Sequence, residues 1–148
     1  MKIDFYVLHT DSRQKSHLFA CHLLEQLYLE QQKTIFIHVN TRDDAERLDA
    51  LLWTYRDDGF LPHHLFSSAS EDHPAPIQIG FGETPLKKHA ILLNLSTTIP
   101  TFYTQFDHLI EIVFTDPLMQ QLARERYKQY RDQGYEINTI KLKADEHD

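Results

Sequence analysis

The sequence has few glycines and a single cysteine, and both shortages exclude classes of function. Only four glycines occur in 148 residues, and the turn after the first expected strand, LHTDSRQKS (8–16), contains none. A glycine-rich turn is what allows backbone amides to approach a pyrophosphate at a helix N-terminus, so a dinucleotide site is excluded there. Cys21 has no partner for an intramolecular disulfide, which favours a reducing compartment. Inside a helix and without an activating neighbour, it is predicted to be a core thiol.

Motifs for metal or nucleophilic chemistry are missing as well. The ten histidines form no HExxH pair, and His17 and His22 do not share a helical face. No serine lies in a GxSxG turn. The glycine pair in GFGET (80–84) lacks the Lys-Ser/Thr of a phosphate loop, so it is interpreted as a strand that ends in a turn. The sequence therefore predicts no catalytic residue, no metal site and no cofactor.

Basic charge is scarce, and long apolar runs are absent. No run approaches the roughly 20 residues that span a bilayer, and the N-terminus is not a signal peptide, so we expect a soluble, cytoplasmic protein. The formal net charge is −7; residues 118–143 hold six Lys or Arg and three Asp or Glu, a balance of +3 that leaves −10 for the remainder. Such an acidic body argues against direct binding to nucleic acid. The small cationic segment suits an acidic peptide better.

Strands alternate with helices along the chain. Short apolar runs predict strands at 3–8, 34–39, 76–81, 90–95 and 108–114, and an edge strand at 135–143. Helices are predicted at 13–31, from Thr41 or Asp43 to about Trp53, and at 117–134, where Asp116-Pro117 begins the helix and Gly134 ends it. Residues 57–76 are predicted to be a long loop. This order predicts an α/β fold: a single three-layer Rossmann-like domain over residues 1–143, with a mostly parallel sheet flanked by helices, and a frayed acidic tail at 144–148.

Two segments have the composition of protein-binding surfaces. In LLWTYRDDGFLPHHLF (51–66), Trp53 and Phe60 flank a polar turn, and large aromatic side chains are favoured interface anchors. The alternative is that Trp53 simply ends a core helix. In LARERYKQYRDQGY (122–135), one stripe of the predicted helix holds Arg124, Tyr127, Lys128 and Arg131, and the buried side is expected to be Leu118, Met119, Leu122, Ala123 and Tyr130. A solvated amphipathic helix is the alternative for this stripe.

The order and spacing of these segments resemble the chi subunit of bacterial DNA polymerase III holoenzyme. The resemblance covers nearly the whole chain, from DFYVL through AxRLDxLLW (45–53), FxPH (60–63) and ILLNLS to LARERYKxYRxxGYxxNT. It implies a non-catalytic accessory subunit of the clamp loader in DNA replication, located in the cytoplasm at the nucleoid-associated replisome. A small nucleotide-dependent enzyme on a Rossmann-like sheet is the alternative.

The resemblance implies two protein partners. The psi subunit of the clamp loader would form a heterodimer with this chain through Trp53, Phe60, Leu61, Pro62 and His63, a surface for which a repair helicase competes with psi in the family. The acidic C-terminal tail of single-stranded DNA-binding protein, which ends in a hydrophobic residue and a free carboxylate, would bind to Val113, Gln120, Arg124, Tyr127, Lys128 and Arg131.

The resemblance also assigns roles within the tail site. Val113 is expected in its apolar floor, Tyr127 as a wall for the terminal aromatic ring, and Arg124 as the group that meets the α-carboxylate. Lys128 and Arg131 would attract the acidic residues upstream. Gln120 stands where a relative has lysine, so we expect a weaker site unless Arg126 or Lys141 compensates.

Overall fold

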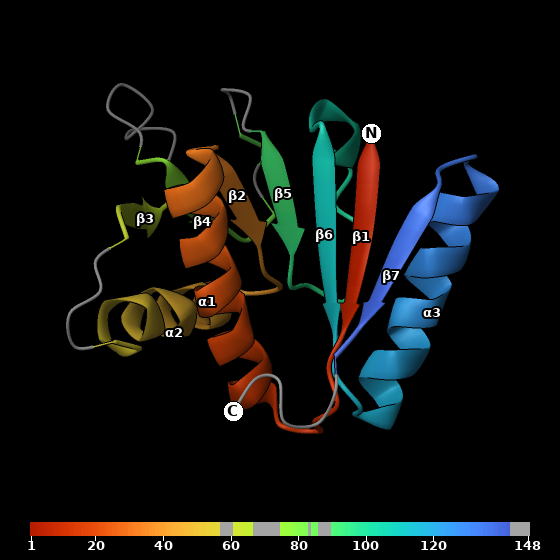
Figure 1. Cartoon of the computed structure of the whole chain (residues 1–148), viewed down its shortest axis with the longest axis horizontal. Coiled ribbons are helices and arrows are strands. Elements are labelled where there is room, and N and C mark those ends of the chain that lie inside the picture. The colour runs from red at the N-terminus through yellow and green to blue at the C-terminus, as the bar shows by residue number, and fades with distance from the viewer. Residues whose placement is uncertain (57–60, 67–74, 83, 86–89, 143–148) are drawn as a thin grey trace.

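The computed structural model describes residues 1–56, 61–66, 75–82, 84–85 and 90–142. Within them, seven strands form one sheet in the order β3-β4-β2-β5-β6-β1-β7, and every neighbouring pair is parallel (Figure 1). The predicted α/β fold is confirmed, and its sheet is parallel throughout. The expected tail at 144–148 lies outside the described residues. The strands are β1 (Lys2–Val7), β2 (Ile35–His38), β3 (His63–Leu65), β4 (Ile77–Gly80), β5 (Ile91–Asn94), β6 (His108–Val113) and β7 (Ile137–Lys141).

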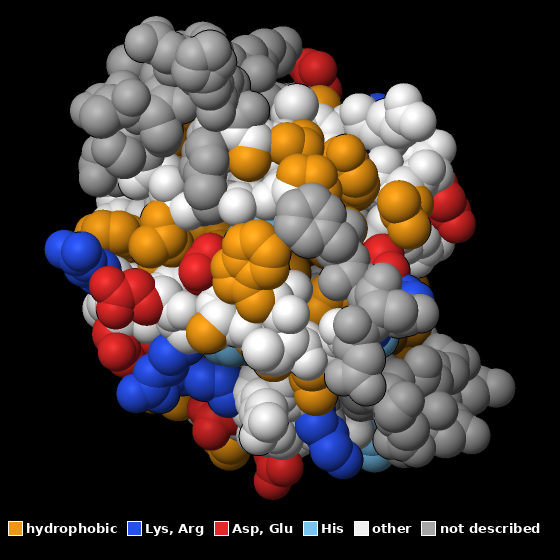
Figure 2. Space-filling view, turned by 90° about the vertical axis from the view of Figure 1, so that its left-hand side faces the viewer, with side chains coloured by type: hydrophobic (Ala, Val, Ile, Leu, Met, Phe, Trp, Pro, Cys, Tyr) orange, Lys and Arg blue, Asp and Glu red, His pale blue; other side chains and the backbone are white. Residues whose placement is uncertain are grey.

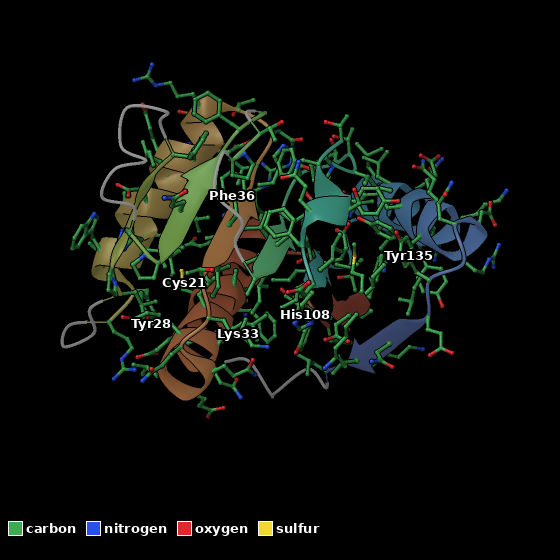
Figure 3. All side chains as sticks on the ribbon, turned by 90° about the horizontal axis from the view of Figure 1, so that it is seen from above. Cys21, Tyr28, Lys33, Phe36, His108 and Tyr135 are labelled. Carbon is green, nitrogen blue, oxygen red and sulfur yellow. The ribbon has the colours of Figure 1, made fainter. Side chains whose placement is uncertain are left out.

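The helices cover both faces of this sheet and give three layers. α1 (Arg13–Gln31) and α2 (Arg42–Thr54) lie on one face, and α3 (Pro117–Asp132) with the 3-10 turn η2 (Tyr103–Gln105) lies on the other. Figure 3 shows this arrangement from above, with α1 and α3 on opposite sides of the twisted strands. Because both faces are covered, the inner strands β2, β4, β5 and β6 are buried on both sides, which explains their largely apolar sequences. None of the described helices is long and apolar enough to cross a bilayer.

Side-chain caps explain where the three helices begin. Ser12 Oγ accepts a hydrogen bond from Lys15 N at 3.2 Å, and Thr41 Oγ1 accepts one from Asp44 N at 3.1 Å. Before α3, the Asp116 carboxylate accepts from Met119 N at 3.0 Å. Each of these bonds satisfies a backbone N–H that has no partner within its own helix. The predicted helix starts are therefore confirmed by local chemistry.

The predicted long loop is wrong in one place, because β3 lies inside it. His63 pairs with Ile77 and Leu65 with Ile79, both in parallel register. A hydrogen bond of 2.7 Å from Phe66 N to Ile79 O continues the ladder. The turn-like composition of the segment hid this strand, since so short a strand forms only where the edge of β4 offers it a partner.

The position of β7 decides what lies beside α3. The chain leaves β6, passes through α3, and returns as β7 on the far side of β1, so that the first and last strands are neighbours (Figure 1). Their register pairs Phe5 with Thr139 and Val7 with Lys141. β7 is the edge strand that the sequence predicted, and it brings the end of the chain next to its beginning.

Candidate functional site

α3 is held on the sheet by a buried polar network around Glu111. Arg126 Nε donates to the two carboxylate oxygens of Glu111 at 3.2 and 3.1 Å. Tyr130 Oη and Asn94 Nδ2 donate to the same carboxylate at 2.7 and 3.0 Å, and Arg126 Nη1 donates to the Thr97 carbonyl at 3.0 Å. Burial raises the pKa of Glu111, and the Arg126 guanidinium opposes that rise. These bonds fix the rotation of α3 and so determine which of its side chains face outward.

The structure corrects two expectations about α3. Arg126 is buried, and its guanidinium is occupied inside the fold. It therefore does not compensate for Gln120. Leu118, expected on the buried side, is 58% exposed, whereas Ala123 and Tyr130 are buried as predicted.

A groove opens between α3 and the strands β1, β6 and β7. It encloses about 340 Å³, within the roughly 300–1,000 Å³ that is usual for ligand pockets. The sheet and the helix both contribute to its lining, which consists of Phe5, Val7, Val113, Thr139 and Lys141 from the strands and Gln120, Ala123, Arg124 and Tyr127 from α3.

The apolar part of the groove is built around two aromatic rings. Tyr127 packs edge-on against Phe5, with ring centroids 5.3 Å apart and planes at 71°. Val113 and Val7 extend this apolar surface along two neighbouring strands. Ala123, small and buried, leaves room between the helix and the strands. The resulting pocket suits an apolar or aromatic side chain.

The charged part of the groove is cationic. Arg124 lies on the helix wall and Lys141 on the strand wall, and none of the lining residues is acidic. Both side chains are exposed. In the part of the chain that the structure describes, neither of them forms an ion pair. A group that enters the apolar pocket therefore meets a cation on each wall, which favours a carboxylate.

Four of the six residues predicted for the tail site line this one groove: Val113, Gln120, Arg124 and Tyr127. The other two, Lys128 and Arg131, are exposed on the same helix and lie outside its lining. Arg131 Nε also lies 3.9 Å from an Asp132 carboxylate oxygen.

Sequence reasoning missed the strand residues Phe5, Val7 and Thr139 of the groove. The signal that identifies them is the two-residue alternation along paired strands, which places Phe5 and Val7 on the same face as Thr139 and Lys141. This alternation identifies the groove residues only once β7 is known to lie beside β1.

A second candidate surface surrounds Trp53 at the end of α2. The Trp53 side chain is 52% exposed, and its ring centroid lies 4.5 Å from that of His63. His63 is itself largely buried and lies 2.6 Å from the Leu61 carbonyl through Nδ1, which fixes its ring. Figure 2 shows the face that carries α2 and β3, where hydrophobic side chains lie among acidic and basic ones.

The residues predicted for this second surface differ in how deeply they are buried. Trp53 is exposed, and Pro62 is half-buried. Leu61 is 1% exposed and belongs to the hydrophobic core. The side chain of Leu61 therefore supports this surface from beneath, and its role in psi binding stays a prediction. Phe60 lies outside the described residues.

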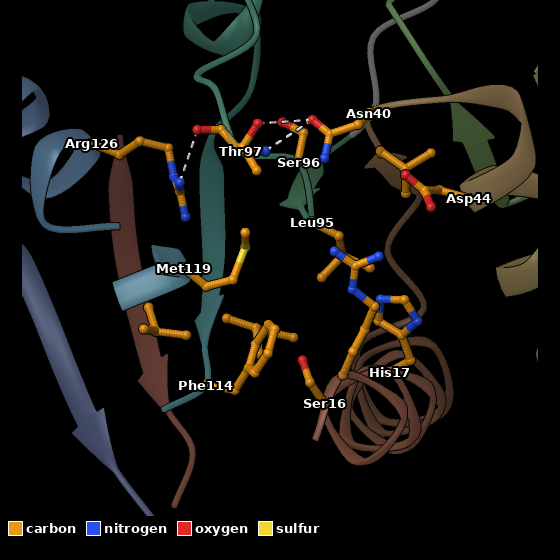
Figure 4. A pocket seen from close by; sticks show the side chains of 14 residues that line it. Ser16, His17, Asn40, Asp44, Leu95, Ser96, Thr97, Phe114, Met119 and Arg126 are labelled. Atoms are coloured by element: carbon orange, nitrogen blue, oxygen red, sulfur yellow. Dashed lines mark hydrogen bonds between the residues drawn. The ribbon is translucent and has the colours of Figure 1, made fainter. Parts of the chain in front are cut away.

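The crevice at the carboxyl ends of β2, β5 and β6 is where an open parallel sheet would bind a nucleotide. It holds only about 50 Å³, enough for a few water molecules. Met119 and Phe114 lie on one side of it and His17 on the other (Figure 4). Its rim is closed by two hydrogen bonds of 3.0 and 3.1 Å from Thr97 to Asn40 Oδ1. Its size gives the nucleotide-enzyme alternative no support.

The two glycines at the end of β4, Gly80 in the strand and Gly82 just after it, are explained by packing and backbone conformation. A Cβ at Gly80 would overlap the ring of Phe36 on the neighbouring strand, and Gly82 has a φ of +111°, which favours glycine. Among the described residues, no three His, Cys, Asp or Glu side chains gather in a way that could hold a metal ion.

Comparison with known protein structures agrees with the fold. The C-terminal domain of the DEAD-box protein Dbp5 superposes with a TM-score of 0.65 at 12% identity, over 95% of this chain and 90% of that domain. A DEAD box protein from Methanococcus jannaschii gives 0.62 at 12% identity, over 96% of this chain and 42% of that protein. At this identity the likeness shows the architecture alone.

Comparison of sequences identifies the family. A family described as "DNA polymerase III chi subunit, HolC" matches residues 1–138. DNA polymerase III subunit chi of Pseudomonas aeruginosa is 33% identical over 95% of this chain and 96% of its own length. The subunit of the same name in Haemophilus influenzae is 32% identical over 91% of this chain and 93% of its own length. That of Escherichia coli is 31% identical over 94% of this chain and 97% of its own length. The chain belongs to the chi subunit family of DNA polymerase III, a family of replication accessory subunits.

Proposed function

We propose that this chain is a non-catalytic adaptor that connects the clamp loader of DNA polymerase III to single-stranded DNA-binding protein. In this proposal it pairs with the psi subunit through the Trp53 surface and binds the acidic C-terminal tail of single-stranded DNA-binding protein in the groove beside α3. It needs no cofactor for either contact and works in the cytoplasm, at the replisome.

One observation carries the proposal for the tail. Four residues that the family resemblance assigns to tail binding converge on a single groove, with an apolar pocket, two cations and no acidic lining residue. A peptide that ends in an apolar residue and a carboxylate is complementary to each of these features. The final side chain would fill the space between Tyr127 and Val113, and the α-carboxylate would accept two hydrogen bonds from the planar guanidinium of Arg124.

Gln120, Lys128 and Arg131 have smaller roles in this proposal. Gln120 lines the helix wall one turn before Arg124 and adds no charge there. Lys128 and Arg131 lie outside the groove lining and add only a weak, long-range attraction for an acidic ligand. Exposed, screened charges of this kind contribute about 0–1 kcal/mol each.

The psi contact rests on the exposure of Trp53. A tryptophan that is 52% exposed at a helix end offers a large apolar area at a small cost in side-chain entropy. In the proposal Trp53, Phe60 and Pro62 contact psi, and the buried Leu61 and His63 support them from beneath. The same surface is the proposed site of competition by a repair helicase.

A calorimetric titration tests the tail site. The ligand is a synthetic peptide with aspartates upstream of a C-terminal phenylalanine, compared with the same peptide carrying a C-terminal amide. We expect Arg124→Ala to weaken binding of the free-acid peptide by about 2 kcal/mol or more, as at an interface hot spot. With the unchanged chain, the amide peptide should bind more weakly than the free-acid peptide by a similar free energy. Arg124→Ala should weaken binding of the amide peptide little further. Equal affinities of the unchanged chain for the acid and the amide would refute the assignment of Arg124.

A further inference from the structure

We infer that the acidic part of the bound peptide leaves the groove over Lys141 on β7, and does not follow α3 over Lys128 and Arg131. The inference rests on the proposed peptide-binding function and specifies the path of the ligand in that same site. It assigns Lys141 as the residue that contacts the acidic side chains upstream of the terminal residue of the peptide.

The first support is the place of Lys141 in the fold. It pairs in register with Val7, and both line the groove across from α3. Arg124 lies on the opposite, helical wall. The two lining cations therefore face each other across the groove, and the positive charge runs from helix to strand. A chain that is anchored at Arg124 by its terminal carboxylate meets its next cation on β7.

The second support is the charge along the helix. Lys128 and Arg131 do not line the groove, and Arg131 already lies 3.9 Å from Asp132. Glu125 is exposed three residues before Lys128, and residues at this spacing are neighbours on a helix surface. An acidic peptide that followed α3 would thus meet carboxylates as well as cations.

The third support is the chemistry of the two cations. Arginine presents a rigid, planar set of donors that matches one carboxylate, whereas lysine is a compact charge on a flexible stem. Lys141 is exposed on the edge strand, and no described acidic side chain forms an ion pair with it. It can therefore serve successive acidic side chains without a fixed geometry.

Fluorescence anisotropy with the full chain and a labelled acidic peptide ending in phenylalanine tests this path. The variants are Lys141→Gln, Lys128→Gln and, as a matched control, Lys33→Gln. Lys33 is an exposed lysine outside the groove, between α1 and β2 (Figure 3). All three remove one positive charge. We expect Lys141→Gln to weaken binding about fivefold, and the other two to change it less than about twofold.

A peptide-side change keeps the test independent of folding. With asparagines in place of the aspartates, the difference between the unchanged chain and Lys141→Gln should disappear. This outcome would place the missing interaction at the acidic side chains.

Two results would overturn the inference in distinguishable ways. If Lys128→Gln weakens binding more than Lys141→Gln, the path over β7 is wrong while the tail site stands. If the unchanged chain does not bind the acidic peptide at all, the proposed function fails and this inference with it.

Discussion

Replacing Arg126 by methionine is the most direct test of how α3 is held on the sheet. Methionine keeps much of the apolar length of arginine but removes the charge and the donors to Glu111 and Thr97. Glu111 would stay fully buried with Tyr130 and Asn94 as its remaining donors. Breaking a buried ion pair on one side costs about 3–5 kcal/mol. We expect a loss near 3 kcal/mol at pH 8, because two of the donors to Glu111 survive.

The pH dependence of that loss follows from the direction of the Glu111 pKa. Burial raises it, and Arg126 opposes the rise, so Arg126→Met raises it further. An acid whose pKa is higher in the folded than in the unfolded state destabilises the fold above the unfolded value, and the cost grows until the pH exceeds the folded value. Lowering the pH through that window protonates Glu111 in the folded state. The deficit of Arg126→Met relative to the unchanged chain should therefore be smaller at pH 5 than at pH 8.

Urea unfolding followed by far-UV circular dichroism gives the free energies at both pH values. The matched control is the double variant Glu111→Gln/Arg126→Met, which removes the unpaired charge. It should lose clearly less stability than the sum of the two single variants, since both act on one network. A loss below about 1 kcal/mol for Arg126→Met at pH 8, or strictly additive effects, would refute the reasoning that this pair positions α3.

Two further predictions concern Trp53 and Cys21. Trp53→Ala should abolish co-purification with psi and lower the free energy of unfolding by less than about 1 kcal/mol. Leu61→Ala, in the core, should lower it by about 2–5 kcal/mol in urea unfolding. Equal losses for the two variants would show that Trp53 is a core residue. Cys21 is buried, and burial raises its pKa to about 12. Its thiol should react with a disulfide reagent at pH 8 only in denaturing urea, and rapid reaction in the native protein would contradict its placement.

Local sequence was enough to place the three helices and to predict where each begins. Two short-range features mark the limits of α3: Asp116-Pro117 begins it, and Gly134, with a φ of +90°, follows its end. Both could be predicted without knowing the fold. The buried strands were equally legible, because a parallel sheet covered on both faces needs apolar residues at nearly every position. β3 was not legible, since its three residues depend on the edge of β4 for hydrogen bonds.

The stripe on α3 shows where local pattern stops being informative. Spacing placed Arg124 and Tyr127 on one helical face but said nothing of the partner that turns Arg126 inward. That partner, Glu111, lies on the preceding strand, inside an apolar run that looked like ordinary core. Spacing likewise put Leu118 on the buried side, although its side chain is 58% exposed in the first turn of α3.

The sequence by itself determined the α/β class, the helix limits, the chi resemblance and the stripe that carries Arg124 and Tyr127. The tertiary structure alone decided that these side chains share a groove with Phe5 and Lys141, which are separated by most of the chain and brought together by the pairing of β1 with β7. Strand order is a long-range property that arises from packing the whole sheet, and no local propensity encodes it. For that reason Lys141 could be assigned as the cation opposite Arg124 only once the position of β7 in the sheet was known.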